Sequence, residues 1–337
     1  MQLSDIDYNL PEELIAQKPI EPRDSARLLV DVEPGEISHR VVADLDTLVG
    51  PGDLIVVNDT KVLPARLVLQ RKTGGAAEVL LLEKRSNDSR LWEALVRPGK
   101  KIKEGELLEY FGKRVVRMGP RTEAGDTFVV EILDEDPLDL ISRIGAMPLP
   151  PYIRGSLKDQ DRYQTVYANK PASAAAPTAG LHFTDDLLER IRRTGATIMS
   201  VELIVGLDTF KPISTDNPLD HVIHSEFYSV SQEVVDACKS ADRVIAIGTT
   251  ATRALESVFT TGELTGRTNL FITPGYSWKI VDVMLTNFHM PKTSLLLMIG
   301  SFLGDRWREL YELAIAERYR FLSFGDAMFI SRRSDNS

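Results

Sequence analysis

The feature that most constrains this fold is a change of pattern that begins near residue 67 and ends near residue 147. Within this stretch, short segments that mix apolar and polar residues follow one another, among them EVLLLE, LWEALV, KRVVRM and TFVVEIL, with GG, PGK and MGP between or beside them. Short strands separated by glycine and proline at regular spacing are typical of a small antiparallel barrel or sandwich. We therefore predict an all-β domain over residues 67–150.

The rest of the chain alternates predicted strands with predicted helices. Strands are predicted at residues 53–59, 197–205, 243–248, 279–287 and 324–330. Helices are predicted at residues 11–17, 185–193 (capped by Thr184), 231–241 (capped by Ser231) and 249–259, and two more begin at Ser294 and Arg306. Because this alternation lies on both sides of the β stretch, we predict a discontinuous α/β domain, residues 1–66 and 151–337, with the all-β domain inserted.

Composition excludes several classes of protein. Hydrophobic residues make up 43% of the chain and charged residues 26%, which indicates a globular protein. The single cysteine, Cys238, excludes an internal disulfide framework and a cysteine-built zinc site. The chain start shows no signal-peptide pattern, and the longest apolar run, LLLMIGSFL at 295–303, is too short to span a bilayer. We therefore expect a cytoplasmic protein with no membrane partner.

The net charge of −9 argues against a protein that coats nucleic acid without specificity, because such binding depends on phosphate neutralisation. A local basic face on an acidic body remains compatible with this charge. Residues 95–121 contain three acids and eight cations, which are Arg97, Lys100, Lys101, Lys103, Lys113, Arg114, Arg117 and Arg121. The first interpretation is a solvated barrel surface, and the second is a face that contacts RNA.

Small and polar residues follow four predicted strands, at the point where each strand ends. The sets are Asn58-Asp59-Thr60, Gly206-Leu207-Asp208-Thr209, Gly248-Thr249-Thr250 and Thr286-Asn287-Phe288-His289. Because ligands of open α/β folds bind at the carboxyl ends of strands, we expect these sets to line a site. The third set begins a helix that continues to Arg253. It either offers free N–H groups to a phosphate or carboxylate, or is an ordinary glycine turn with a threonine cap.

The segment AAPTAGLHFT at residues 175–184 is the most unusual in the chain. His182 titrates near neutral pH and is a candidate acid or base, while Phe183 is a candidate for stacking on a nucleobase. The small residues before them let a backbone approach a ligand closely, and they are Pro177, Thr178, Ala179 and Gly180. A tight turn with a packed aromatic ring and a hydrogen-bonded histidine explains the same pattern, and both interpretations stay open.

A metal site is not indicated by the remaining histidines. HVIHSE at residues 221–226 places His221 and His224 near Glu226, but this is not HExxH, and a spacing of three suits a metal only on a helix. We expect a surface or substrate-facing loop there, and no metal.

Eight motifs occur in order along the chain: IDYNLPEELIAQKP, RDSARLLV, GDLIVVNDTKVLPARL, RYQTVYA, AAPTAGLHFT, IGTTATRALES, TNFHMPKTSLLLMI and FGDAMFI. Together they resemble the S-adenosylmethionine:tRNA ribosyltransferase-isomerase family of queuosine biosynthesis, over residues 6–330. The resemblance implies two domains, a barrel-like α/β domain and an inserted small antiparallel β-barrel.

The resemblance also implies the activity. The family transfers and isomerises the ribosyl part of S-adenosylmethionine onto 7-aminomethyl-7-deazaguanine at the wobble position of tRNA, which gives epoxyqueuosine, adenine and methionine. The sulfonium acidifies the C5′ hydrogens, so that a base forms an ylide, adenine leaves, the amine captures the sugar and an alkoxide closes the epoxide. S-adenosylmethionine is a co-substrate, and neither a metal nor another cofactor is implied. We expect a monomer.

Two other functions are compatible with the residues. One is an S-adenosylmethionine-dependent transferase with a small-molecule acceptor, and the other is an RNA-binding relative without catalysis. Adenine release that depends on precursor-bearing tRNA distinguishes the ribosyltransferase-isomerase activity from both of these alternatives.

Roles follow from residue chemistry as hypotheses. His182 is the first candidate for acid–base catalysis and His289 the second, while Asp59 and Asp208 are expected to face the sulfonium. Thr249, Thr250 and Arg253 are expected to hold a methionine carboxylate or a phosphate. The other predicted substrate-binding residues are Asn58 and Asn287, which suit base or sugar edges, and Arg66, Pro177, Thr178, Ala179, Gly180, Phe183 and Gly206.

The chain departs from the family pattern at three motifs. Two departures are mild: Ala172-Ser173-Ala174 stands where GSV is usual before AAPTAGLHFT, and Ile223 replaces a methionine in HxMHxE. Where LHVGxGTF is usual, residues 203–210 read LIVGLDTF, so Ile204 replaces a histidine and Asp208 replaces a glycine. A catalytic role for that family histidine therefore does not carry over to this chain.

Overall fold

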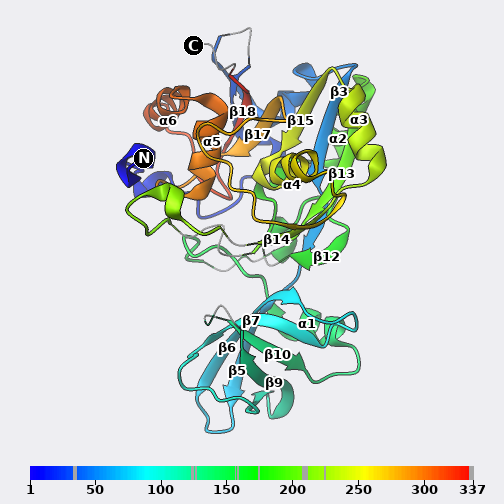
Figure 1. Cartoon of the computed structure of the whole chain (residues 1–337), viewed down its shortest axis with the longest axis vertical. Helices are drawn as coiled ribbons and strands as arrows, with labels where there is room; N and C mark the ends of the chain where they lie inside the picture. Colours follow the sequence, from blue (N-terminus) through cyan, green and yellow to red (C-terminus); the bar gives the residue numbers. More distant parts are fainter. Residues whose placement is uncertain are drawn as a thin grey trace. The chain divides into compact units, whose positions relative to one another are not determined.

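A computed structural model describes the chain at residues 1–32, 36–122, 125, 127–155, 157, 159–173, 175–206, 212–223 and 225–333. The chain forms two compact units (Figure 1). The larger unit comprises Met1–Thr60, Pro150–Asn169 and Pro177–Ser337, and the smaller comprises Lys61–Leu149 and Lys170–Ala176. The predicted fold class is confirmed, because the first unit is mixed α/β and the second contains a closed antiparallel barrel.

The larger unit is built on a nine-stranded sheet in the order β16-β14-β13-β3-β15-β17-β18-β1-β2. The strands are β1 (Arg27–Asp31), β2 (Ser38–Val41), β3 (Asp53–Asn58), β13 (Thr197–Leu203), β14 (Glu226–Ser229), β15 (Arg243–Ile247), β16 (Thr265–Thr268), β17 (Val283–Asn287) and β18 (Ala327–Ser331). Four adjacent strands, β13, β3, β15 and β17, are parallel, with Val201 opposite Asn58 and Ile247 opposite Leu285. Their carboxyl ends therefore meet at one edge of the sheet.

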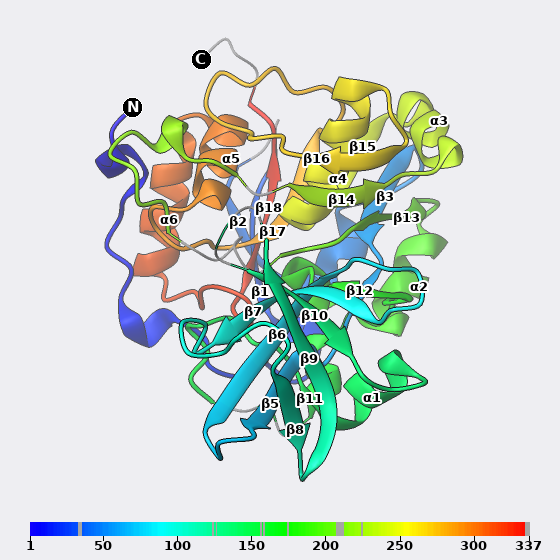
Figure 2. The same cartoon turned by 60° about the horizontal axis from the view of Figure 1, so that its bottom comes forward.

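Both faces of this sheet are covered, which explains why its central strands are continuous apolar runs. On one face, Ile55 and Val57 of β3 belong to a buried cluster with Phe183 and with Leu187 of α2 (Asp185–Arg193). The helix α4 (Gly248–Thr261) packs against β13, β3, β15 and β17. Two further helices, α5 (Ser294–Leu303) and α6 (Arg306–Ala316), pack against each other, and α5 contacts β18 (Figure 2). The remaining helix is α3 (Gln232–Ser240).

The predicted helix caps are confirmed, and one predicted helix is wrong. Thr184 accepts a hydrogen bond from the Leu187 N–H at 3.1 Å, and Ser231 caps α3 in the same way. Instead of a helix at residues 11–17, the chain forms a single 3-10 turn, η2 (Glu12–Leu14). Ile15 then pairs with Phe321 in a parallel bridge. Seven residues do not sustain an isolated helix, so this tertiary pairing determines the backbone.

The smaller unit contains a six-stranded barrel. Its strands are β5 (Arg66–Arg71), β6 (Ala76–Lys84), β7 (Leu91–Arg97), β8 (Leu107–Tyr110), β9 (Lys113–Arg121) and β10 (Phe128–Ile132). They pair in the order β5-β6-β7-β10-β9-β8, and β8 closes the barrel on β5. Along β7 the buried residues alternate with outward ones, so Trp92, Ala94 and Val96 fill the interior.

The smaller unit is not entirely β structure. A helix that was not predicted, α1 (Pro137–Ile144), follows the barrel, with Asp136 as its N-cap and Pro137 at its first position. The short β11 (Gly145–Ala146) then pairs with β5. The segment Lys170–Ala176 also belongs to this unit, since β12 (Lys170–Ser173) pairs with β4 (Thr60–Val62). The unit boundaries therefore differ from the predicted domain boundaries at residues 66 and 151.

The helices in the described part of the chain are all too short or too polar to cross a membrane.

Candidate functional site

The short helix η6 (Thr178–His182) is the centre of the candidate site and carries the middle of AAPTAGLHFT. It packs against β17, against α4, and against two other 3-10 helices, η3 (Arg23–Ser25) and η5 (Gln160–Tyr163). Pro177 precedes it, and Phe183 ends it with a ring that is buried in the core. Phe183 is therefore a packing residue here, and the segment presents His182 at the carboxyl edge of the sheet.

A hydrogen-bonded chain holds His182. The Asn287 side chain at the end of β17 lies 3.1 Å from His182 Nε2, and the same Nδ2 donates to the Asp326 carbonyl at 3.2 Å. Thr178 Oγ1 donates to Asn287 Oδ1 at 2.9 Å. Because a carbonyl only accepts, the Asn287 amide must present its N–H groups to Asp326 and to His182. Nε2 is thus the acceptor, which assigns the neutral imidazole its proton on Nδ1.

Burial and neighbouring cations keep His182 neutral. The His182 side chain is buried, and this burial together with the charges of Arg320 and Arg162 lowers its pKa to about 4. The Arg23 backbone acts in the opposite direction and is outweighed. A neutral imidazole at pH 7 can accept a proton but cannot donate one as an imidazolium. The geometry therefore favours a base over an acid for the resting state of His182.

His182 also lines a small cleft in the larger unit. The cavity volume is about 10 Å³, which corresponds to roughly one water-sized group. The lining residues are Pro19, Ile20, Arg23, Arg162, Leu181, His182, Ser323 and Phe324. The lining thus combines apolar side chains with two arginines and a histidine.

A second set of polar atoms lies on the Gly180 side of η6. A Cβ atom at Gly180 would lie 1.9 Å from the Tyr167 hydroxyl, and one at Gly248 would lie 3.3 Å from the Ala179 side chain. Within the described chain, the hydroxyl groups of Tyr167, Thr165 and Thr250 are buried without a hydrogen-bond partner. Buried hydroxyl groups are nearly always satisfied, so these three are candidates for ligand contacts.

The charge of Asp59 acts on one of these hydroxyl groups. Burial, and to a smaller extent the negative charge of Asp59, raises the pKa of the Tyr167 phenol. Thr165 and Tyr167 belong to the motif RYQTVYA, for which the sequence indicated no chemistry. Their burial without partners makes them candidates for ligand contacts, and this property is invisible in the sequence.

The start of α4 distinguishes between two interpretations of Gly248-Thr249-Thr250. Gly248 has φ +86°, a conformation that favours glycine, and the N-cap is Ile247, with no side-chain cap. The Thr250 hydroxyl is one of the unpartnered groups. Neither threonine caps the helix, so its first N–H groups have no side-chain acceptor.

Asn58 has a structural role at the edge of the sheet. Its Nδ2 donates to the Leu203 carbonyl at 2.9 Å, and its Oδ1 accepts from the Leu203 N–H at 3.2 Å. The side chain thereby joins the ends of β3 and β13, and it is fully buried. These bonds occupy the groups that were expected to contact a base or sugar.

Arg253 faces a protein carboxylate. Arg253 Nη1 lies 2.6 Å from Glu226, and Nη2 donates to the Thr268 carbonyl at 3.2 Å. Glu226 in turn accepts from the Gly206 N–H at 3.2 Å. Both charged side chains are buried, so this ion pair positions the backbone at Gly206 and engages the guanidinium that was expected to bind a substrate anion.

His289 lies within an aromatic cluster. Its ring Nε2 lies 3.0 Å from Thr286 Oγ1. Its backbone N–H donates to the Tyr311 hydroxyl at 3.0 Å, and its backbone carbonyl accepts from the Tyr8 hydroxyl. Burial lowers the pKa of His289 to about 3. These contacts suit a packed, neutral histidine, and its role in acid–base catalysis stays a prediction.

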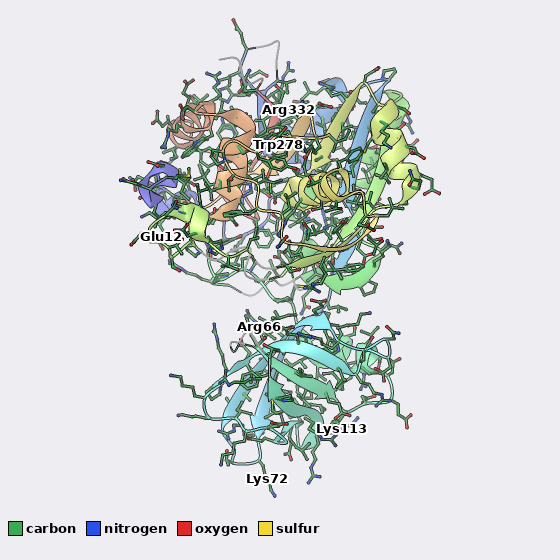
Figure 3. The ribbon with its side chains drawn as sticks, viewed as in Figure 1. Glu12, Arg66, Lys72, Lys113, Trp278 and Arg332 are labelled. Atoms are coloured by element: carbon green, nitrogen blue, oxygen red, sulfur yellow. The ribbon has the colours of Figure 1, made fainter. Side chains whose placement is uncertain are left out.

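Several predicted residues lie elsewhere. Arg66 belongs to the smaller unit, at the start of β5, and lies 4.0 Å from Glu78 (Figure 3). Asp208, Thr209 and His224 lie outside the described residues. No group of three metal-ligating side chains occurs among the residues that the structure describes.

Two of the eight barrel cations pair with carboxylates. Lys113, which lies on the smaller unit in Figure 3, is 3.0 Å from Asp134, and Arg117 is 2.5 Å from Glu131. Both cations are at least half exposed, so these ion pairs contribute little to stability. For these two cations the pairing favours the first interpretation, a solvated barrel surface.

Comparison with known proteins identifies relatives over the whole chain. A family model described as queuosine biosynthesis protein matches residues 3–330. An S-adenosylmethionine:tRNA ribosyltransferase-isomerase of Symbiobacterium thermophilum is 47% identical over 98% of this chain and 100% of its own length. One of the same name from Rubrobacter xylanophilus is 46% identical, covering 98% of both chains.

A solved structure is similar as well. The crystal structure of the S-adenosylmethionine tRNA ribosyltransferase from Thermotoga maritima has a TM-score of 0.55 and 35% sequence identity, and covers 97% of this chain and 99% of that chain. These matches span the eight ordered motifs, and they confirm the resemblance that the motifs predicted.

Proposed function

Because the chain belongs to the queuosine biosynthesis family and is an enzyme of the ribosyltransferase-isomerase type, we propose that it transfers and isomerises the ribosyl part of S-adenosylmethionine onto tRNA. The acceptor is 7-aminomethyl-7-deazaguanine at the wobble position, and the products are epoxyqueuosine, adenine and methionine. A substrate of this kind places the enzyme in the cytoplasm. The observation that carries the proposal is His182, a buried and neutral imidazole that Asn287 orients at the carboxyl edge of the sheet.

In this proposal His182 is the base that removes a C5′ proton from S-adenosylmethionine. The positive sulfonium acidifies that C–H bond, and a base with an available lone pair completes the transfer. The lone pair of Nε2 accepts from Asn287 in the structure, so the substrate must take the place of that amide. The adenine then leaves, the amine captures the sugar, and closure of the epoxide releases methionine.

Other residues on the same edge bind the co-substrate. The Asp59 carboxylate beside Tyr167 stabilises the sulfonium, since a carboxylate and an aromatic face both favour a cation. The hydroxyl groups of Tyr167, Thr165 and Thr250 satisfy polar groups of the ribose and adenine. All of these residues belong to the larger unit of one chain, so the proposal needs no second copy and agrees with a monomer.

The test is an incubation of the purified protein with S-adenosylmethionine labelled in its ribosyl part and with precursor-bearing tRNA. We expect label in the RNA and an equal amount of free adenine. tRNA with guanine at the wobble position is the matched control, and should receive no label. Transfer to free 7-aminomethyl-7-deazaguanine without tRNA would instead support a small-molecule acceptor, and tRNA binding without adenine release would support an RNA-binding protein without catalysis.

A further inference from the structure

Three arginine side chains surround His182, and the mechanism above uses none of them. Arg23 and Arg162 line the same cleft as His182, and the charge of Arg320 acts on its ring. Arg23 lies on η3, Arg162 on η5, and Arg320 in the segment between α6 and β18. Two of these parts of the chain line the cleft, and the third adds a positive charge that acts on His182.

Backbone carbonyls hold these guanidinium groups in place. Arg23 donates to the Gln164 carbonyl at 2.7 Å and to the Asp161 carbonyl at 3.2 Å. Arg162 donates to the Ile20 carbonyl at 2.7 Å, and Arg320 donates to the Lys18 carbonyl. A neutral carbonyl positions a guanidinium without cancelling its charge, and each guanidinium has five N–H groups, so donors remain for a ligand.

The nearby carboxylates compensate this set only in part. Arg162, whose side chain is 11% exposed, forms an ion pair with Glu21, whose side chain is 67% exposed and is therefore partly screened by water. Glu21, Asp159 and Asp185 favour the charged form of Arg23, yet burial and the neighbouring Arg162 still lower its pKa.

For Arg320, too, a nearby carboxylate does not outweigh burial. Burial lowers the pKa of the Arg320 guanidinium even though the Asp326 carboxylate opposes the change. Asp326 itself accepts hydrogen bonds from the backbone N–H groups of Arg27 at 3.0 Å and Arg320 at 2.7 Å. Its charge is therefore already shared with two backbone donors.

The size of the cleft limits what these arginines can bind. A volume of about 10 Å³ is roughly that of one oxygen-sized group. Pro19, Leu181 and Phe324 also line the cleft, and apolar neighbours lower the local dielectric and strengthen an ionic contact. Guanidinium N–H groups in this setting suit one oxygen of a carboxylate or a phosphate.

We propose that Arg23, Arg162 and Arg320 form an oxyanion site beside His182, which binds one end of a substrate. The two substrates of the proposed function each carry such a group, the methionine carboxylate of S-adenosylmethionine and a phosphodiester of tRNA. The arginine site itself does not depend on the proposed function. Only the choice of ligand, the methionine carboxylate or the tRNA phosphodiester, rests on it. A bound oxyanion offsets the positive charges that disfavour the imidazolium of His182, so binding makes this base stronger when the substrate is present.

The test measures binding without turnover, so it does not depend on the proposed reaction. Wild type, Arg23→Gln, Arg320→Gln and Arg23→Lys are titrated with S-adenosylmethionine, with precursor-bearing tRNA and with inorganic phosphate. Arg192→Gln is the matched control, because Arg192 lies exposed on α2 and the substitution removes the same charge. Circular dichroism and Tm confirm that each variant is folded.

Each outcome assigns the site or removes it. A Kd for S-adenosylmethionine that rises roughly ten- to a hundredfold in both Gln variants, with an unchanged Kd for tRNA, assigns the carboxylate. If only the Kd for tRNA rises, and the slope of its logarithm against the logarithm of the salt concentration falls by about the amount for one phosphate contact, the bound group is the phosphodiester. Values within twofold of Arg192→Gln for all three ligands would overturn the proposal. If the Gln variants do not fold, Arg23→Lys and competition by phosphate against each substrate on wild type decide in the same way.

Discussion

The cations of the barrel and the arginines of the His182 cleft differ in what they face. On β9, Lys113 and Arg117 meet the carboxylates of Asp134 and Glu131 at the surface. In the cleft, Arg23 meets backbone carbonyls, and it is partly buried. A paired and exposed cation has little charge left for a ligand, whereas a buried cation held by neutral groups keeps its field. The number of cations in a segment therefore predicts an anion site poorly. Whether nearby carboxylates pair with those cations is more informative.

The largest effect should come from the base in the cleft. We expect His182→Ala to lower kcat about 10²- to 10⁴-fold, because a positioned base contributes this much to proton transfer. The Kd for S-adenosylmethionine should change little. Single-turnover release of adenine measures the loss, and near-normal turnover with unchanged binding would contradict the role of His182. His289→Gln tests the second acid–base candidate in the same assay, since His289 is held by a separate set of hydrogen bonds, to Thr286 and Tyr311.

Acid should destabilise the protein through the same two histidines. Their pKa values in the folded state, about 4 for His182 and about 3 for His289, lie below the ordinary value of 6.5. The unfolded chain therefore binds more protons below pH 6.5, so stability falls as the pH drops from 6.5 toward those values and is unaffected above 6.5. At pH 4.5 each histidine should cost about 3 kcal/mol relative to pH 7.

Urea denaturation at pH 7 and pH 4.5 measures this difference. In His289→Gln the decrease in the free energy of unfolding from pH 7 to pH 4.5 should be smaller than in wild type, by the amount expected for one histidine. An equal loss in both proteins would mean that His289 is not buried in its neutral form.

A smaller effect should come from the unpartnered phenol. Tyr167→Phe removes a hydroxyl group that has no partner within the described chain, so Tm should not fall. The Kd for S-adenosylmethionine should rise about two- to tenfold, because one neutral hydrogen bond to the ligand is lost. Tyr228→Phe is the matched control, since that hydroxyl donates to the Glu263 carbonyl at 2.9 Å. The control should lose stability and keep its affinity, and the reverse pattern would remove Tyr167 from the site.

The smallest effect should come from the barrel. We expect Arg114→Ala with Arg117→Ala to change the free energy of unfolding by about 1 kcal/mol or less, as for other exposed charges. The Kd for tRNA should stay within about twofold of wild type. A weaker Kd and a flatter salt dependence would break the comparison, because the barrel cations would then contact phosphate.

Sequence patterns predict what depends on neighbouring residues. The strand ends at Asn58, Ile247 and Asn287 do meet at one edge, because parallel strands share a direction and apolar runs mark their length. Thr184 and Ser231 are predictable caps for the same reason, since a cap and its helix are adjacent in the chain. The failure at residues 11–17 arises from a pairing with Phe321, more than three hundred positions away.

Properties that depend on distant partners are not predictable in this way. Arg253 follows a glycine turn that suggests anion binding, yet Glu226, which engages it, precedes it by 27 positions. Arg23, Arg162 and Arg320 share no motif, so nothing in the sequence indicates that they surround one histidine. Thr165 and Tyr167 lie in a recognisable motif, but their lack of partners appears only in the folded chain.

The insertion of the barrel has a consequence for the order in which the enzyme is made. β1 and β3 are synthesised before the barrel strands, but their partners β18, β13 and β15 are synthesised after them. His182 obtains its hydrogen-bond partners only when Asn287 and Asp326 emerge, near the end of translation. The nascent chain therefore contains all six barrel strands long before its site can assemble, so a product terminated before Asn287 is inert toward S-adenosylmethionine.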